Sequence, residues 1–259
     1  MDIENIRLID QNFLFHATHV PSQYPEMQTI HSVGFSYANT GLSCDTFNII
    51  HVTDGKLLNL DALTGAIEKY RKNGLEFCLW AHEYNLTPDL EKQLADLNLS
   101  QNGEEVGMRL ILDNYEKIAS PKHEKILAVN SEERLQSFSQ VLAANWTPPD
   151  ANVIKYYHKT RNAYLTGNHN IQLLLFHEGE NALATCELFP TDDDTVGIYG
   201  LATLEDARGQ GIGSALMTYC LNLAKDTGYK NVVLQATEDG LGIYEKLGFK
   251  AFGKYFEYG

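Results

Sequence analysis

A run of alternating glycines at residues 208–214, Arg-Gly-Gln-Gly-Ile-Gly-Ser, is the part of this sequence best suited to chemistry. Glycine lacks a Cβ atom, so its backbone N–H groups can approach an anion closely and can adopt left-handed conformations. A helix predicted over residues 211–227 begins in this run and directs the positive end of its dipole at the same anion. The pattern predicts a phosphate cradle, with pyrophosphate as its natural ligand. In the alternative, the glycines serve only a tight turn, at a cost in helix stability.

Two common phosphate-binding loops do not fit this run. The P-loop pattern G-x-x-x-x-G-K-[ST] requires a lysine that is absent from the segment. A Rossmann G-x-G-x-x-G pattern requires glycine at position 214, where Ser214 stands, and an acidic residue about 20 residues later, where Gln235 and Ala236 lie. Fewer than 50 residues follow the run, too few for a dinucleotide-binding fold.

A second motif follows at a characteristic separation. The pattern Arg208-x-x-Gly211-x-Gly213 precedes a predicted helix, a predicted strand and then Ile-Tyr-Glu-Lys-Leu-Gly-Phe at residues 243–249. Together the two motifs resemble the GNAT superfamily of acyl-CoA-dependent N-acetyltransferases, over about residues 124–259. The layout is also similar to a subgroup in which a diverged GNAT-like half precedes a motif-complete one. The resemblance implies acetyl-CoA as co-substrate and a primary amine, in a small molecule or a peptide, as acceptor.

The resemblance also implies roles for particular residues. Backbone groups of the strand before the loop, at Leu201, Ala202 and Thr203, would pair with the pantetheine arm of acetyl-CoA. Main-chain amides of the loop would hold the pyrophosphate, at Arg208, Gly209, Gln210, Gly211, Ile212, Gly213 and Ser214. Tyr244 matches the tyrosine that protonates the departing CoA thiolate, since the pKa values of a phenol and a thiol, about 10 and about 8.5, are close. Thr237 and Gly240 stand where many members carry Asn and Ala, so the contact of Thr237 with the pantetheine arm is expected to differ.

The sequence leaves the general base open. Some members carry a Glu near the start of the strand before the loop, but the matching residue here is Gly197. Glu187 on the preceding predicted strand is our first candidate, and the acidic loop at residues 192–194, Glu238 and a water chain are alternatives. Cys186 and Cys220 could suggest an acyl-cysteine mechanism, but no His/Asp partner pattern supports it, so we expect direct attack in a ternary complex.

The elements that position these residues alternate between strand and helix. In the C-terminal half we expect strands at 126–129, 171–177, 182–189, 196–203, 231–236 and 251–257, and helices from 131, at 152–165, 211–227 and 239–247. The N-terminal half predicts strands at 47–52, 75–81 and 108–112, and helices at 60–72 and 88–97. The shared order predicts an internal duplication, although any α/β domain alternates in this way and the two halves share few identities.

The expected architecture is therefore a tandem GNAT-like α/β fold, with a mixed central sheet flanked by helices in each half. A polar stretch at residues 113–125 suggests a boundary near residue 122. We expect a diverged N-terminal domain at 1–122, which lacks the CoA loop and has Leu94 where Tyr244 falls, and an acetyltransferase domain at 123–259.

Composition restricts the partners. The 34 acidic and 20 basic side chains give a net charge of −14, which disfavours nucleic acid and anionic membranes as partners. No apolar run is long enough to span a bilayer, and the first nine residues do not resemble a secretory signal. The four cysteines are widely spaced without a metal-binding pattern, so we expect no metal site, reduced core thiols and a cytoplasmic location.

Other functions remain compatible with these residues. A non-catalytic acyl-CoA-binding or sensing module is the main alternative, because Gly197 replaces a carboxylate, whereas the presence of Tyr244 favours catalysis. O-acylation of a hydroxyl group is a third reading. The acceptor, the acyl chain, the oligomeric state and the pathway leave no readable pattern in the sequence.

Overall fold

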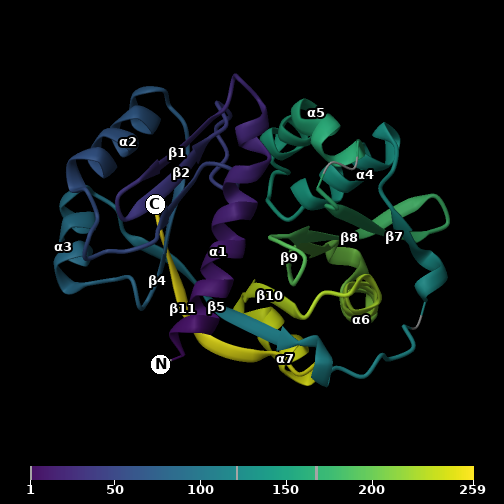
Figure 1. Ribbon diagram of the computed structural model, residues 1–259. Coiled ribbons are helices and arrows are strands. Elements are labelled where there is room, and N and C mark those ends of the chain that lie inside the picture. Colours follow the sequence, from purple (N-terminus) through teal and green to yellow (C-terminus); the bar gives the residue numbers. More distant parts are fainter. Residues whose placement is uncertain (1, 121, 167–168) are drawn as a thin grey trace. The chain divides into compact units, whose positions relative to one another are not determined.

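The computed structural model describes residues 2–120, 122–166 and 169–259 (Figure 1). Met1, Gly167, Asn168 and Pro121, which belongs to the polar stretch, lie outside the described residues. The predicted fold class, mixed strands flanked by helices, is confirmed. The described residues group into two compact units, neither of which is continuous in sequence. Unit 1 comprises Met1–Met108, Gln235–Lys246 and Lys250–Gly259, and unit 2 comprises Arg109–Leu234 and Leu247–Phe249.

Unit 2 contains most of the predicted site. Its elements are β6 (Ile126–Ala128), α4 (Glu132–Ala143), α5 (Ala151–Leu165), β7 (Gln172–Glu178), β8 (Asn181–Pro190), β9 (Thr195–Thr203), α6 (Ile212–Thr227) and β10 (Asn231–Ala236), whose last two residues belong to unit 1. The strand order is β10-β9-β8-β7-β6; β9 and β10 are parallel and the other neighbours are antiparallel. The predicted hairpin β7–β8 is confirmed. Ser131 begins α4 because its side chain accepts a hydrogen bond from the Arg134 amide.

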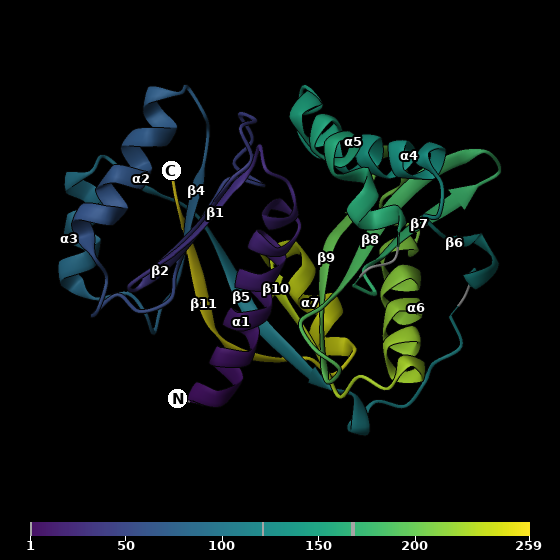
Figure 2. The same ribbon diagram turned by 45° about the horizontal axis from the view of Figure 1, so that its top comes forward.

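The two faces of the unit 2 strands carry different helices. Cys186 of β8 contacts Cys220 of α6, with the sulfur atoms 3.4 Å apart. Side chains alternate between the faces of a strand, so Glu187 points to the other face, where α4 and α5 lie. The helices α4, α5 and α6 can be followed around β7–β9 in Figure 2. The general-base candidate is thus separated by the sheet from the helix that follows the glycine loop.

Unit 1 contains the N-terminal elements together with the end of the chain. They are α1 (Ile3–His19), β1 (Gln28–Ser32), β2 (Phe35–Asn39), β3 (Ile49–Val52), α2 (Leu60–Lys72), β4 (Cys78–His82), α3 (Pro88–Asp96), β5 (Gln101–Ile111, which ends in unit 2), α7 (Glu238–Lys246) and β11 (Lys250–Tyr258). Short 3₁₀ turns complete the fold at Pro21–Gln23, Leu112–Asn114, His123–Lys125 and Glu205–Ala207. The strand order in unit 1 is β1-β2-β3-β4-β11-β5. The helices and strands predicted for this half are present, whereas α1, β1 and β2 were not predicted.

The C-terminal strand completes the sheet of the N-terminal half. β11 pairs antiparallel with β4, with Tyr255 opposite His82. On one face of β3 and β4, Ile50 and Leu79 pack against Leu63 and other apolar residues of α2 and α3. A chain segment from each half therefore contributes to unit 1, and the domains expected at 1–122 and 123–259 stay a prediction.

Two short helices end alike in the two halves. α3 is followed by Asn98 at φ 56°, and α7 by Gly248 at φ 95°. In each half, the chain therefore leaves the helix through a residue in the left-handed backbone conformation. These residues are the centres of Leu97-Asn98-Leu99 and Leu247-Gly248-Phe249, which the duplication hypothesis aligns. The shared backbone conformation supports that hypothesis.

Candidate functional site

Strands β9 and β10 pair over only part of their length. Within the described residues their register runs from Thr195–Asn231 to Gly197–Val233. β9 nevertheless continues for six residues beyond Gly197, to Thr203. The edge of β9 at Leu201, Ala202 and Thr203 therefore lies past the paired stretch, where its backbone groups can bind an extended ligand. This is the edge at which the sequence predicts binding of the pantetheine arm.

A bulge shapes β9 just before that edge. On β8, only Cys186 separates Thr185, which pairs with Ala202, from Glu187, which pairs with Tyr199. On β9 two residues fill the same interval, and one of them, Gly200, has φ 56°. A bulge of this kind leaves the extra residue outside the strand ladder and redirects the backbone. Sequence reasoning missed this feature, although an isolated glycine within a strand is a signal for it.

The glycine loop has the backbone geometry of an anion cradle. Gly209 and Gly211 adopt φ 73° and 74°, and a Cβ atom added at either would meet nothing within 4 Å. Helix α6 starts at Gly211, which offers no side chain to cap the helix, and its first turn contains no acidic residue. The first N–H groups of α6 thus receive no hydrogen bond from an N-cap side chain, and the positive dipole end of α6 lies next to Gly209 and Gly211, which have open space at their Cβ positions. The cradle therefore fits a pyrophosphate group.

Neighbouring side chains hold the loop in place. The guanidinium of Arg208 donates through Nε to the Thr203 carbonyl, at 3.1 Å, which links the loop to the end of β9. Lys122 donates through Nζ to the Gln210 carbonyl, at 2.9 Å. Lys122 was not predicted, because it precedes the loop by 88 residues and only the fold brings it there. Its ammonium adds positive charge beside the cradle.

The corresponding part of the N-terminal half is closed. β3 pairs with β4 along its whole length, from Ile49–Cys78 to Val52–Ala81, so these strands do not separate. In the loop after β3, a Cβ atom on Gly55 would lie 2.0 Å from the Asn85 carbonyl oxygen. The side chain of Asn59 caps α2 by accepting from the Ala62 amide, at 3.1 Å. The start of α2, where an anion would otherwise bind, is therefore already capped by the Asn59 side chain.

Tyr244 lies on α7 with 8% of its surface exposed. Its ring folds back along the helix, because a Cβ atom on Gly240 would lie 2.8 Å from Cε2 and 3.5 Å from the phenol oxygen of Tyr244. Gly240, which departs from the family pattern, therefore makes room for this ring. Thr237 accepts the Gly240 and Leu241 amides through its carbonyl oxygen at the start of α7. Thr237 and Tyr244 belong to unit 1, and the glycine loop to unit 2.

Glu187 is 2% exposed and lies opposite Tyr199, next to the bulge. Its carboxylate affects the pKa of Tyr164 on α5. Burial first, then Tyr156, and then the charge of Glu187 raise the pKa of the Tyr164 phenol well above its usual value. A carboxylate beside phenols in a dry environment is one setting in which a proton can be held and passed on.

Other candidates for proton transfer lie elsewhere. Asp192 accepts the Asp194 and Thr195 amides and so shapes the turn before β9. That turn is at the opposite end of β9 from Leu201, about 20 Å away at about 3.3 Å per residue. Cys186 is fully buried, and its hydrogen bond with Cys220 followed by burial raises its pKa, so it is a poor nucleophile.

The described part of the chain contains neither a metal-binding cluster nor a membrane-spanning helix. Among its His, Cys, Asp and Glu side chains, no group of three or more is arranged to hold a metal ion. None of its helices combines the length and the apolar character needed to cross a membrane.

Other N-acetyltransferases share part of the sequence. The family model of the GNAT acetyltransferases matches residues 135–249. N-acetyltransferase 8B of Homo sapiens is 35% identical over 85 residues, which cover 30% of this chain and 37% of that protein. N-acetyltransferase 8B of Rattus norvegicus is 34% identical over 86 residues, which cover 30% of this chain and 39% of that protein. The matched region thus spans less than two fifths of these relatives.

Solved structures share the fold over nearly the whole chain. A GCN5-related N-acetyltransferase from Kribbella flavida matches with a TM-score of 0.67 and 14% identity, over 96% of this chain and 94% of that one. A tandem GNAT protein from the clavulanic acid biosynthesis pathway matches with a TM-score of 0.59 and 14% identity, over 99% and 94%. Residues 135–249 thus match the GNAT family of acetyltransferases, and the chain shares its fold with solved GNAT proteins.

Proposed function

We propose that this protein is an acetyl-CoA-dependent N-acetyltransferase that acts on a primary amine, in a small molecule or a peptide. One observation carries the proposal. The uncapped start of α6, with Gly209 and Gly211 open to the surroundings, follows directly after the unpaired edge of β9. An anion site next to an extended binding edge suits a ligand that combines a pyrophosphate with an amide-rich arm.

The chain's own residues would then bind and orient the ligand. Leu201, Ala202 and Thr203 offer backbone groups to the arm, and the amides of residues 208–214 face the pyrophosphate. Thr237 at the start of α7 is a further candidate contact. Bound acetyl-CoA supplies an activated thioester carbonyl for attack by the amine. The bulge at Gly200 frees backbone groups of β9 that can stabilise charge on an oxygen atom.

Proton transfer is assigned to two side chains. We assign Glu187 the removal of the amine proton, directly or through water, because it is the buried carboxylate beside the bulge. We assign Tyr244 the donation of a proton to the leaving sulfur, because the ordinary pKa values of phenols and thiols, about 10 and about 8.5, are close. In this scheme the amine attacks directly, without an acyl-enzyme, and the domain at 123–259 performs the reaction.

The N-terminal domain at 1–122 is proposed to bind no CoA. The full pairing of β3 with β4, the contact at Gly55 and the cap at Asn59 support this assignment. The four buried free cysteines support a reducing compartment, the cytoplasm, as the location. A non-catalytic acyl-CoA-binding module remains the alternative function, because Gly197 replaces the carboxylate that some family members use.

Calorimetric titration with acetyl-CoA tests the binding step. We expect one site in the unchanged protein and none after Gly211→Glu, which places a carboxylate in the cradle. Gly179→Glu is the matched control, because Gly179 in the β7–β8 turn also has a positive φ, 60°, and open space around its Cβ position. Two sites would show that the N-terminal half binds acetyl-CoA, and no binding to the unchanged protein would refute the proposal.

Release of CoA thiol in the presence of a panel of amines tests the reaction. We expect turnover with at least one amine, reduced at least tenfold by Tyr244→Phe while acetyl-CoA binding stays intact. Binding without turnover across the panel would favour the non-catalytic module. Turnover unaffected by Tyr244→Phe would overturn the role of the phenol and leave the binding site standing.

A further inference from the structure

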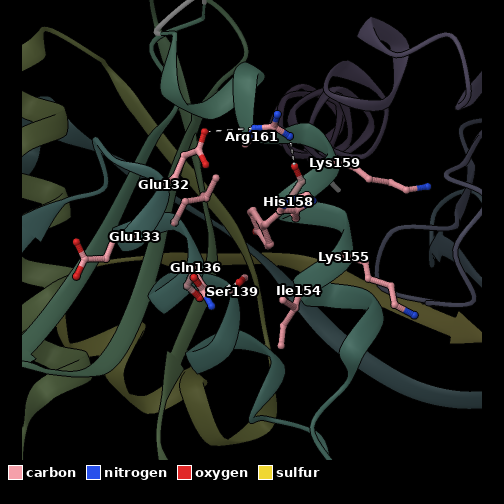
Figure 3. A pocket seen from close by; sticks show the side chains of 11 residues that line it. Glu132, Glu133, Gln136, Ser139, Ile154, Lys155, His158, Lys159 and Arg161 are labelled. Atoms are coloured by element: carbon pink, nitrogen blue, oxygen red, sulfur yellow. Dashed lines mark hydrogen bonds and ion pairs between the residues drawn. The ribbon is translucent and has the colours of Figure 1, made fainter.

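A cavity of about 610 Å³ lies between α4 and α5 in unit 2, away from the residues assigned to acetyl transfer (Figure 3). Cavities of this size commonly hold small molecules. Its wall combines carboxylate, amide, hydroxyl, imidazole, guanidinium and aliphatic groups, from Glu132, Gln136, Ser139, His158, Arg161 and Ile154. The cavity therefore offers both polar contacts and apolar surface.

The cavity is separate from the proposed acyl-CoA site. Phe138 and Leu142 of α4 face Gly200 of β9, since a Cβ atom there would lie 3.8 Å from a carbon atom of each. A helix turns about 100° per residue, so Gln136, which lines the cavity, lies about 200° from Phe138. Leu135 and Tyr157 also line the cavity, and Tyr157 packs edge-on against Phe138, but none of the lining residues is assigned to the proposed acyl-CoA site.

The α5 wall is positive in a negative protein. The 15 residues of α5 include Lys155, Lys159 and Arg161 and no acidic residue, in a chain of net charge −14. Both lysines line the cavity, and in Figure 3 they extend away from Arg161, which lies beside Glu132. The local potential therefore favours an anionic group near α5, and Arg161 is the cation placed to bind it directly.

The guanidinium of Arg161 already binds a carboxylate. Its Nε lies 3.4 Å from Oε1 of Glu132, and its NH1 donates to the His158 carbonyl at 3.0 Å. The Glu132 side chain is 75% exposed and that of Arg161 39%, so solvent weakens the attraction in this pair. A second carboxylate can displace Glu132 at little cost and use the planar fork of the guanidinium.

We propose that the cavity between α4 and α5 is a second binding site, for a small organic carboxylate with a short apolar tail. The carboxylate of the ligand replaces that of Glu132 on Arg161. The tail lies against the apolar part of the wall, at Ile154 and Leu135. Gln136 and His158 offer further polar contacts.

Titration of the whole protein with sodium hexanoate, at constant ionic strength and with saturating CoA, tests this site. Hexylammonium and hexanol serve as matched probes with reversed and with no charge. We expect hexanoate to bind and hexylammonium not to bind. Arg161→Gln should weaken hexanoate binding at least fivefold, whereas Glu132→Gln should tighten it severalfold, because it removes the competing carboxylate.

Two control variants distinguish the replacement of Glu132 by the ligand carboxylate on Arg161 from a general effect of charge. Glu133→Gln and Lys159→Gln change the same charges at side chains that line the cavity but lie outside the ion pair of Arg161 with Glu132. We expect both to leave hexanoate binding within twofold. Failure of hexanoate to bind, equal binding of hexylammonium, or equal effects of Glu132→Gln and Glu133→Gln would each overturn the proposal. None of these outcomes depends on acetyl transfer.

Discussion

The hydroxyl group of Thr185 on β8 donates a hydrogen bond to the backbone carbonyl oxygen of Gly200 on β9, at 2.7 Å. Thr185 is fully buried, and Gly200 holds the left-handed conformation of the bulge. The bond therefore fixes the orientation of the peptide group that precedes Leu201. Two residues outside the glycine loop thus set the direction of the edge proposed to bind the pantetheine arm.

Gly200→Ala tests this arrangement. The added Cβ atom has ordinary contacts, the nearest at 3.8 Å, so its cost arises from φ 56° rather than from a clash. We expect the free energy of unfolding to fall by about 1 to 2 kcal/mol and acetyl-CoA binding to weaken. Denaturant unfolding and calorimetry measure the two effects. An unchanged affinity would show that the bulge does not shape the binding edge.

Gly240→Ala tests the packing of Tyr244. Alanine favours a helix by about 1 kcal/mol over glycine, but its Cβ atom would lie 2.8 Å from the Tyr244 ring and force it to move. We expect kcat to fall with little change in the KM for acetyl-CoA. Gly242→Ala is the control, because its Cβ atom meets nothing within 4 Å on the same helix. Equal kcat values for the two variants would contradict the proposed position of the phenol.

Local patterns explain which parts could be predicted. Helix α2 was predicted with its observed bounds, because Asn59 caps its start and Gly74 follows its end. The glycine loop was predicted for the same reason, since its conformation depends on adjacent residues. β1 was missed because it is largely exposed and polar, so that it lacks the alternation of a half-buried strand.

Features that depend on distant residues were not visible. The bulge at Gly200 requires the register of β8 against β9, and the setting of Glu187 requires the tyrosines of α5. The pairing of β11 with β4 joins segments more than 170 residues apart. No sequence pattern within either segment specifies its partner, so these relationships emerge only in the fold.

The four cysteines provide a test of the direct mechanism. All four are buried, and the contact of Cys186 with Cys220 raises the pKa of the Cys186 thiol. We expect a thiol reagent such as 5,5′-dithiobis(2-nitrobenzoate) to label none of them within minutes at neutral pH, and all four after unfolding. Turnover should be unaffected by the reagent. Rapid labelling of Cys186 together with loss of turnover would instead favour an acyl-cysteine.

A carboxyl group on β5 makes stability depend on pH. Burial, and then the charge of Glu257 on the neighbouring strand β11, raise the pKa of Glu105 from 4.5 to about 8. Between these values the folded protein keeps a proton that the unfolded chain releases. The free energy of unfolding must therefore fall as the pH rises from about 4.5 to about 8, with a slope of at most about 1.4 kcal/mol per pH unit from this group.

Glu105→Gln should remove most of this dependence. The amide stays neutral, so the variant should match the unchanged protein near pH 4 and exceed its stability near pH 8.5. Glu257, whose pKa is raised by burial and then by Asp45, should leave a smaller slope of the same sign. Glu104→Gln is the control, because Glu104 is exposed and pairs with Lys254 at 2.8 Å. Urea unfolding at several pH values measures each slope, and parallel curves for Glu105→Gln and the unchanged protein would show that Glu105 is ionised in the fold.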